Sequence, residues 1–200
     1  MVRIATAPGS EELLSGAVDA LAETMELRDR HTSAHCGRVV ELAGRLGRRL
    51  GLDEDALRQL DYAARVHDIG KVGVPDLVLH KRGPLDAIEF ELLREHSAWG
   101  AGLVLRVPGL ERVAQIVRHH HERYDGLGYP DGLEGQESPL ESRILAVADA
   151  YVAMLEDRPY RRALPPSRVA EELELGRARQ FDPEVLDALE AVKPLAPPAA

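Results

Sequence analysis

Residues 140–155 read LESRILAVADAYVAML, and this stretch decides the fold class. Apolar side chains fill most of its positions, which predicts a strongly apolar helix in the core of the protein. Asp149 lies in the middle of the run, where an ionised carboxylate is costly unless it is paired or binds a metal. The stretch therefore predicts a core helix that carries one functional carboxylate.

Outward from this stretch, the chain continues to favour helix over strand. Ala, Leu, Glu and Arg are abundant, and a hydrophobic content of 44% is enough for a core. Helices are expected at residues 10–27, 33–50, 53–66, 86–93, 100–106, 110–121, 140–155, 167–175 and 183–192. Proline and glycine predict two long ordered loops, at 72–86 and 125–139. No repeat and no sustained alternating pattern is present, so we expect an all-α helical bundle with long ordered loops.

The length of 200 residues predicts a single domain. We expect an N-terminal extension or the start of a linker helix at 1–19, the functional domain at 20–192 and a flexible tail at 193–200. An apolar stripe in the first helix either packs on the domain itself or forms a homodimer contact. Its members are Leu13, Leu14, Val18, Leu21 and Met25.

The charge and cysteine content exclude several classes of protein. A net charge of −9 argues against a polymeric nucleic acid partner, which needs a broad basic surface, but it leaves a small anionic ligand open. The single cysteine, Cys36, cannot form an internal disulfide, and the first ten residues contain no apolar signal core. No apolar run approaches the ~20 residues of a membrane span. A cytoplasmic protein without a membrane segment is expected.

Histidines and carboxylates recur in a pattern that indicates a metal site. The stretch 118–132, RHHHERYDGLGYPDG, holds three successive histidines, and a solvated cluster is the alternative to ligation. The adjacent His67 and Asp68 offer one nitrogen and a carboxylate, which can bridge two metals where an imidazole cannot. His35 and Asp149 are candidate partners of this pair. A second set of nitrogen ligands is expected at His96, His120 and His121.

Six ordered motifs resemble a known family. They are HDIGK (67–71), KRGPL (81–85), REHSAWG (94–100), HHERYDGLGYP (120–130), RILAVAD (143–149) and DRPYR (157–161). Together with His35 they resemble the HD-GYP subfamily of the HD superfamily, which are metal-dependent phosphohydrolases. The resemblance covers roughly residues 20 to 190. It implies an all-helical cyclic di-GMP phosphodiesterase with an iron or manganese cluster.

The resemblance also implies the metal ligands. One divalent ion would be held by His35, His67, Asp68 and Asp149. Asp68 would bridge to a second ion, held by His96, His120 and His121. Imidazole and carboxylate ligands without a thiolate agree with iron or manganese. His119 matches no ligand of the family, and we expect it at the surface or beside a ligand.

Catalytic and substrate-binding residues follow from the same resemblance. Lys71 is expected to contact a phosphate oxygen or to help protonate the leaving oxygen, and a salt bridge is the alternative. Arg158 and Arg161 would contact the ligand phosphates, with a solvated basic turn as the alternative. Gly128, Tyr129 and Pro130 would form the substrate side of the glycine-rich loop. Tyr129 and Tyr160 either stack on guanine or cover the pocket.

The chain departs from part of the family at His31. Members with three metals resemble one another in carrying a glutamate four residues before the position of His35, and His31 stands there in this chain. A neutral imidazole cannot bridge ions or offset the charge of an extra cation as a carboxylate does. We therefore expect two metal ions, with His31 as a hydrogen-bond partner of a ligand or a residue at the pocket rim.

The resemblance predicts hydrolysis of cyclic di-GMP to pGpG and, after a second cleavage, GMP. One alternative is an HD-type hydrolase of another cyclic dinucleotide or nucleotide. Another is a regulatory module that binds a cyclic dinucleotide or a protein without hydrolysis. If the chain is a fragment, an upstream sensor or receiver domain is expected.

Overall fold

The computed structural model of the chain describes residues 9–28, 32–157 and 162–192. Its α-helices are α1 (Ser10–Arg28), α2 (Thr32–Arg49), α3 (Glu54–Val66), α4 (Asp76–Leu79), α5 (Ala87–Arg94), α6 (His96–Val104), α7 (Glu111–His119), α8 (Leu140–Met154), α9 (Pro166–Leu175) and α10 (Pro183–Ala191). Two 3-10 helices are η1 (Ile69–Gly73) and η2 (Gly135–Glu137). The described residues form only isolated bridges and no strand, which confirms the predicted all-α class. None of the helices described is long and apolar enough to cross a membrane.

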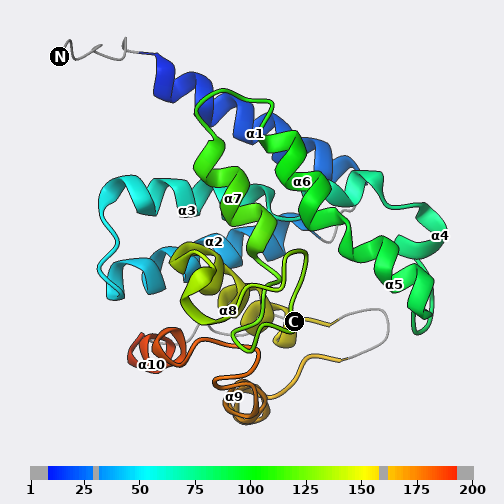
Figure 1. Cartoon of the computed structure of the whole chain (residues 1–200), viewed down its shortest axis with the longest axis vertical. Helices are drawn as coiled ribbons and strands as arrows, with labels where there is room; N and C mark the ends of the chain where they lie inside the picture. Colours follow the sequence, from blue (N-terminus) through cyan, green and yellow to red (C-terminus); the bar gives the residue numbers. More distant parts are fainter. Residues whose placement is uncertain (1–8, 29–31, 158–161, 193–200) are drawn as a thin grey trace.

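The helix α8 lies at the centre of the molecule. It packs against α2, α3, α7, α9 and α10. In Figure 1, α6 and α7 lie side by side, α9 and α10 lie at the lower end, and α4 and α5 project to one side. Six apolar side chains of α8 are buried, five of them fully, and others pack partly buried against the core, which is why its sequence is apolar around much of the helix. This packing holds Asp149 inside the bundle.

The apolar stripe of α1 packs on the domain itself. Val18 and Met25 are buried, and Leu14 and Leu21 pack against the same core. Leu13 is the exception and does not pack on the domain, because it is 76% exposed. Contacts of α1 with α3, η1 and α2 bury the rest of the stripe. Burial of these side chains stabilises α1 against the bundle without a second chain.

Three predicted boundaries were wrong. The segment 72–86 is not only loop, because α4 follows Pro75, whose fixed φ is compatible with a helix start. The helix α6 begins at His96 and not at Gly100, since packing against η1 and α7 outweighs the weak helix propensity of its first residues. The helix α7 ends at His119, so His120 and His121 lie in the turn that follows it.

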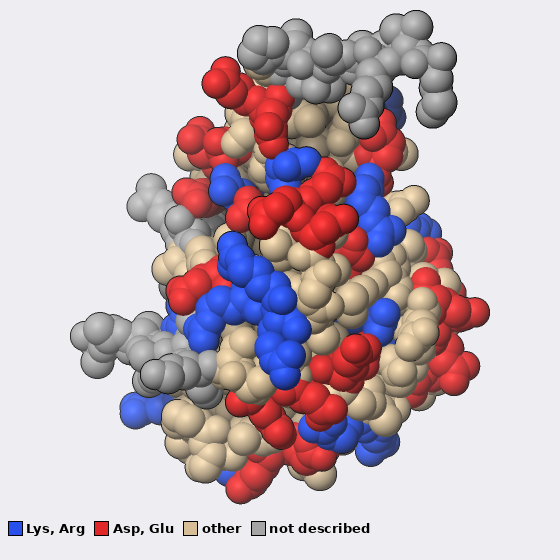
Figure 2. Space-filling view, turned by 90° about the vertical axis from the view of Figure 1, so that its left-hand side faces the viewer, with Lys and Arg blue, Asp and Glu red and all other residues tan. Residues whose placement is uncertain are grey.

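The connection between α2 and α3 lies on the side of the molecule that faces the viewer in Figure 2. Basic side chains form a band there, next to a group of acidic ones. The last turn of α2 carries Arg48 and Arg49, and the first turn of α3 carries Glu54 and Asp55. Basic side chains at the C-terminal end of α2 and acidic side chains at the N-terminal end of α3 interact favourably with the helix dipoles. His35 and His67 lie at the opposite ends of the same two helices.

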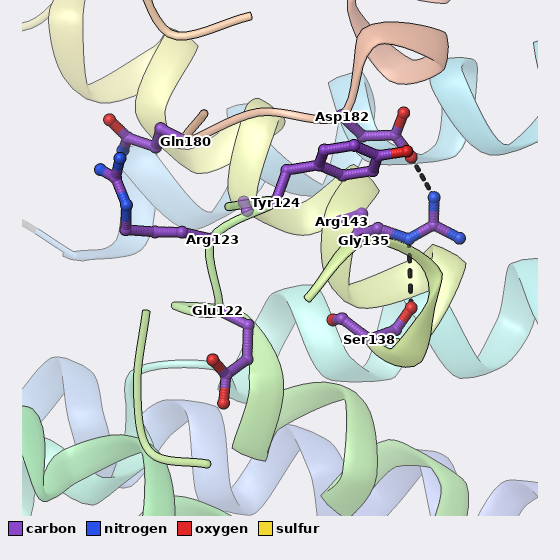
Figure 3. A pocket seen from close by; sticks show the side chains of 9 residues that line it. Glu122, Arg123, Tyr124, Gly135, Ser138, Arg143, Gln180 and Asp182 are labelled. Atoms are coloured by element: carbon purple, nitrogen blue, oxygen red, sulfur yellow. Dashed lines mark hydrogen bonds and ion pairs between the residues drawn. The ribbon is translucent and has the colours of Figure 1, made fainter. Parts of the chain in front are cut away.

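Residues 179–182, just before α10, bind the loop that follows α7. Arg143 on α8 donates through Nε to the Ser138 carbonyl (3.1 Å) and through Nη1 to the Asp182 carboxylate, around the small pocket of Figure 3. The backbone of residue 180 accepts from the Tyr124 amide (3.3 Å), and that of residue 179 accepts from the Asp125 amide (2.7 Å). The glycine-rich loop is therefore fixed to the core on its outer side.

Candidate metal centre

The seven residues predicted as metal ligands come together in two adjoining groups. One group consists of Asp68, His96, His120 and His121, and the other of His35, His67 and Asp149. Within each group the ligand atoms lie within 4.8 Å of one another. The ends of α3 and α7, the starts of α2 and α6, and the middle of α8 supply them. Helix ends that meet at one point thus collect ligands that are far apart in the sequence.

Three of the histidines are oriented by their own backbone. The Nδ1 atoms of His67, His96 and His120 lie 2.8, 2.7 and 2.6 Å from the carbonyl oxygens three residues earlier. A carbonyl only accepts, so Nδ1 carries the proton and Nε2 keeps a free lone pair. Each of these Nε2 atoms is buried and has no hydrogen-bond partner among the described residues. Buried acceptors without a partner are costly, and a bound cation would satisfy all three.

Asp68 lies between the two groups. Its Oδ2 is 3.6 Å from the Nε2 of His67, and its Oδ1 is 3.5 Å from the Nε2 of His96. Two ligand atoms that are each about 2.1 Å from one ion, at roughly 90–110° to each other, lie about 3.0–3.5 Å apart. Each carboxylate oxygen is therefore at a suitable distance to share an ion with a different histidine. This is the arrangement that a bridging ligand requires.

His35 is held between two carboxylates of the α8 region. Its Nε2 is 3.0 Å from Asp149 Oδ1, and its Nδ1 is 2.8 Å from Glu156 Oε2. The sequence interpretation did not identify Glu156. Glu156 lies just beyond the end of α8, and nothing in the local sequence distinguishes it from a solvated glutamate.

Burial sets the protonation of the cluster. It lowers the pKa of His121 to about 3 and lowers the pKa values of His120 and His96 as well, so these imidazoles are neutral. Burial opposes ionisation of Asp68, but attraction to the neighbouring basic groups, Lys71 foremost, outweighs burial and holds the pKa of this carboxyl well below its usual range. Burial raises the pKa of Cys36 to about 12, so its thiol stays protonated. Neutral imidazoles and ionised carboxylates are the forms that bind metals.

Lys71 lies at the edge of the cluster. Its Nζ is 2.5 Å from Asp68 Oδ2, and a quarter of its side chain is exposed. The salt bridge that the sequence left as an alternative is therefore present. Because its partner is the carboxylate between the two groups, the same contact also places the ammonium beside the ligand atoms.

The glycine-rich loop turns back over His121. Gly126 has a φ of 72°, and a Cβ at Gly128 would lie 2.3 Å from the Arg123 nitrogen, so both positions require glycine. The Tyr129 amide donates to the His121 carbonyl (3.3 Å), and the two rings are 5.0 Å apart. Pro130 follows through a cis peptide bond. The loop thus places Tyr129 against a ligand histidine.

Two residues that the sequence interpretation missed support this loop. Glu122 is buried, and its carboxylate accepts from the amides of residues 131, 132 and 133 at 2.7, 3.1 and 3.2 Å. The guanidinium of Arg94 lies 4.7 Å from the centre of the Tyr129 ring, a cation–π contact. His119 contacts Asp131 (Nε2–Oδ2 3.0 Å) and belongs to neither ligand group.

Four residues of the predicted site lie outside the described residues. They are His31, Arg158, Tyr160 and Arg161. The described residues on either side of 158–161 are close together, because Asp157 Oδ1 accepts from the Ala163 amide (2.7 Å) and the Met154 carbonyl from the Leu164 amide (2.8 Å).

Comparison with known proteins agrees with this geometry. The family model of the HD domain matches residues 19–185. The chain is 41% identical over 181 residues to the cyclic di-GMP phosphodiesterase response regulator RpfG of Xanthomonas campestris pv. campestris, covering 90% of this chain and 48% of the relative. It is 36% identical over 173 residues to the 3′3′-cGAMP-specific phosphodiesterase 2 of Vibrio cholerae, covering 84% of this chain and 33% of the relative. The chain thus spans less than half the length of either curated relative.

A solved structure has the same fold. Bd1817, an HDG"Y"P protein from Bdellovibrio bacteriovorus, superposes with a TM-score of 0.67 at 18% identity, over 92% of this chain and 65% of that one. At this identity the likeness concerns the fold alone. The family model covers most of the chain. The chain therefore belongs to the HD domain family, and its ordered motifs resemble those of the HD-GYP group within it.

Proposed function

We propose that the chain is a metal-dependent phosphodiesterase that hydrolyses cyclic di-GMP to pGpG and, after a second cleavage, to GMP. The observation that supports this most strongly is the pair of ligand groups with Asp68 between them. Two adjacent metal ions are suited to in-line displacement at phosphorus. The curated relative that is named a cyclic di-GMP phosphodiesterase aligns over 90% of the chain, which supports the choice of substrate.

The proposed centre holds two divalent ions. His35, His67, Asp68 and Asp149 would hold one, and Asp68, His96, His120 and His121 the other. Imidazole and carboxylate donors without a thiolate favour iron or manganese over a closed zinc site. When bound, the ions would lower the pKa of water and neutralise phosphoryl charge.

The remaining residues would bind and orient the dinucleotide. Lys71 holds a proton on Nζ beside Asp68, and it would contact a phosphate oxygen or pass this proton to the leaving oxygen. The segment Gly128, Tyr129 and Pro130 would form the substrate side of the pocket, with the Tyr129 ring available for a base. Arg158 and Arg161 would contact the phosphates, a role that rests on the motif alone.

A second substrate, 3′3′-cGAMP, is favoured by one observation. A curated relative that is specific for this dinucleotide is 36% identical over 84% of the chain. The two substrates differ in one base, so the contacts to the bases decide between them, and the metal ligands do not. Turnover of both dinucleotides, measured side by side with the same protein, distinguishes the two substrates.

Anaerobic loading with Fe(II) or Mn(II), followed by incubation with cyclic di-GMP, tests the proposal. Linear product on chromatography is expected, and the Asp68→Ala protein should form none. A loaded protein that binds the dinucleotide but releases no linear product would contradict hydrolysis and favour the binding module. The cytoplasmic location, the upstream domain, the homodimer and the limits 20–192 stay predictions.

A further inference from the structure

His35, the fourth buried histidine of the centre, differs from the other three in the group that its Nδ1 atom contacts. His67, His96 and His120 each place Nδ1 on the carbonyl three residues earlier, which belongs to their own turn. His35 places Nδ1 on the carboxylate of Glu156, which is 121 residues away along the chain. The orientation of His35 therefore depends on a contact between α2 and the end of α8.

We infer that Glu156 is a positioning residue that holds His35 in the orientation in which its Nε2 faces the metal centre, an inference that rests on the proposed metal centre. The two nitrogens of an imidazole point to opposite sides of the ring. Glu156 contacts Nδ1 at 2.8 Å, while Asp149, from the ligand group, contacts Nε2 at 3.0 Å. Glu156 therefore lies on the far side of the ring from the ligand group and acts through His35.

A basic residue of α2 holds the same carboxylate. Arg38 is three residues after His35, so both side chains lie on one face of α2. The Arg38 Nη1 atom lies 3.7 Å from Glu156 Oε1, which leaves Oε2 for the hydrogen bond from His35. About a fifth of the Glu156 side chain is exposed, so solvent competes only partly for this contact. The carboxylate is thus fixed from α2 and α8 together.

A carboxylate supports a ligand histidine more strongly than a neutral carbonyl does. A charged acceptor forms a shorter and stronger hydrogen bond with Nδ1–H, fixes the tautomer and increases the basicity of Nε2. Asp149 lies within α8, and Glu156 lies seven residues later, just beyond the end of this helix, so one short segment orients His35 and also supplies a ligand. Loss of Glu156 should weaken the group of His35, His67 and Asp149 and spare the group of His96, His120 and His121.

Metal binding of three variants tests this inference without a catalytic readout. Metal-free protein is titrated with Mn(II) against a chromophoric chelator, and circular dichroism checks the fold. Glu156→Ala should bind one of the two ions about 10- to 100-fold more weakly, the range usual for loss of such a partner. Glu156→Gln should recover most of the affinity, because its amide oxygen still accepts from Nδ1–H.

The chain offers a matched control in Glu41→Gln. Glu41 is also on α2 and pairs with Arg45 at 3.8 Å, close to the 3.7 Å between Arg38 and Glu156. It contacts none of the described histidines, so its loss should leave both affinities unchanged. If Glu156→Ala binds both ions with unchanged affinity, or if Glu156→Gln binds them no better than Glu156→Ala, the positioning role of Glu156 is wrong. The proposed metal centre would still stand. An unmodified protein that binds no ion would overturn the metal centre as well.

Discussion

Gly70→Ala should disrupt the metal centre by forcing η1 away from α6. A Cβ at this position would lie 1.9 Å from the His96 carbonyl oxygen and 2.5 Å from the Gly100 nitrogen. Real Cβ atoms keep at least 3.0 Å from such atoms, so the two backbones must separate by more than about 1 Å locally. Both contacts are to backbone, and no side-chain rotation can relieve them.

The displacement would affect both stability and metal binding. Overpacking of a close-packed site costs about 1–3 kcal/mol and sometimes more, and we expect the upper end here. Asp68 lies two residues before Gly70, and its Oδ1 is 3.5 Å from the Nε2 of His96. Metal–ligand distances tolerate about 0.2 Å, so a separation of this size should release the ion that Asp68 and His96 share.

Urea denaturation and elemental analysis measure the two effects. Gly102→Ala is the matched control, because Gly102 lies on the same helix α6 and a Cβ there has no heavy atom within 4 Å. This change should raise the free energy of unfolding by about 0.5–1 kcal/mol, since alanine is the better helix former, and it should keep both ions. If Gly70→Ala is as stable as the control and keeps its metal, the close approach of η1 and α6 is wrong.

Five further substitutions test other parts of the structure. Asp68→Ala should lose both ions, because Asp68 lies close to histidines of both groups, and His121→Ala should lose chiefly one ion. Full metal content in Asp68→Ala would disprove the bridge. Arg143→Ala leaves a buried carboxylate unpaired and should lower the free energy of unfolding by about 3–5 kcal/mol in urea. Arg168→Ala removes an exposed ion pair and should lower the free energy of unfolding by less than about 1 kcal/mol. If Arg143→Ala and Arg168→Ala lower it equally, the buried pair is not the stronger one. Gly128→Ala places a Cβ 2.3 Å from a backbone nitrogen and should cost about 1–3 kcal/mol in urea, and unchanged stability would contradict the close approach of the loop to residues 122 and 123.

Local sequence signals predicted most of the helices. Asp53 caps α3 through the Ala56 amide, and the apolar run around Asp149 became the central helix. Histidines and an aspartate in an apolar run are conspicuous in sequence, because they are costly to bury without a partner. Their division into two ligand groups was predicted from the resemblance of the ordered motifs to a known family.

The supporting contacts could not be predicted in the same way. Glu156 meets His35 across 121 residues, and Glu122 accepts from amides nine to eleven residues away, so neither glutamate differs locally from a solvated one. The start of α6 was also missed, because packing of His96 and Gly100 against η1 decides it and helix propensity does not. Long-range packing is the part that single-sequence patterns do not contain.

The metal content of the unmodified protein tests the central claim most directly. Anaerobic reconstitution with Mn(II), removal of loose metal and elemental analysis give the number of ions per chain. Two adjoining ligand groups, with Asp68 of one group close to His67 of the other and with His31 in place of a bridging glutamate, predict a value close to two. A value near zero, one or three ions per chain would contradict the two-metal centre.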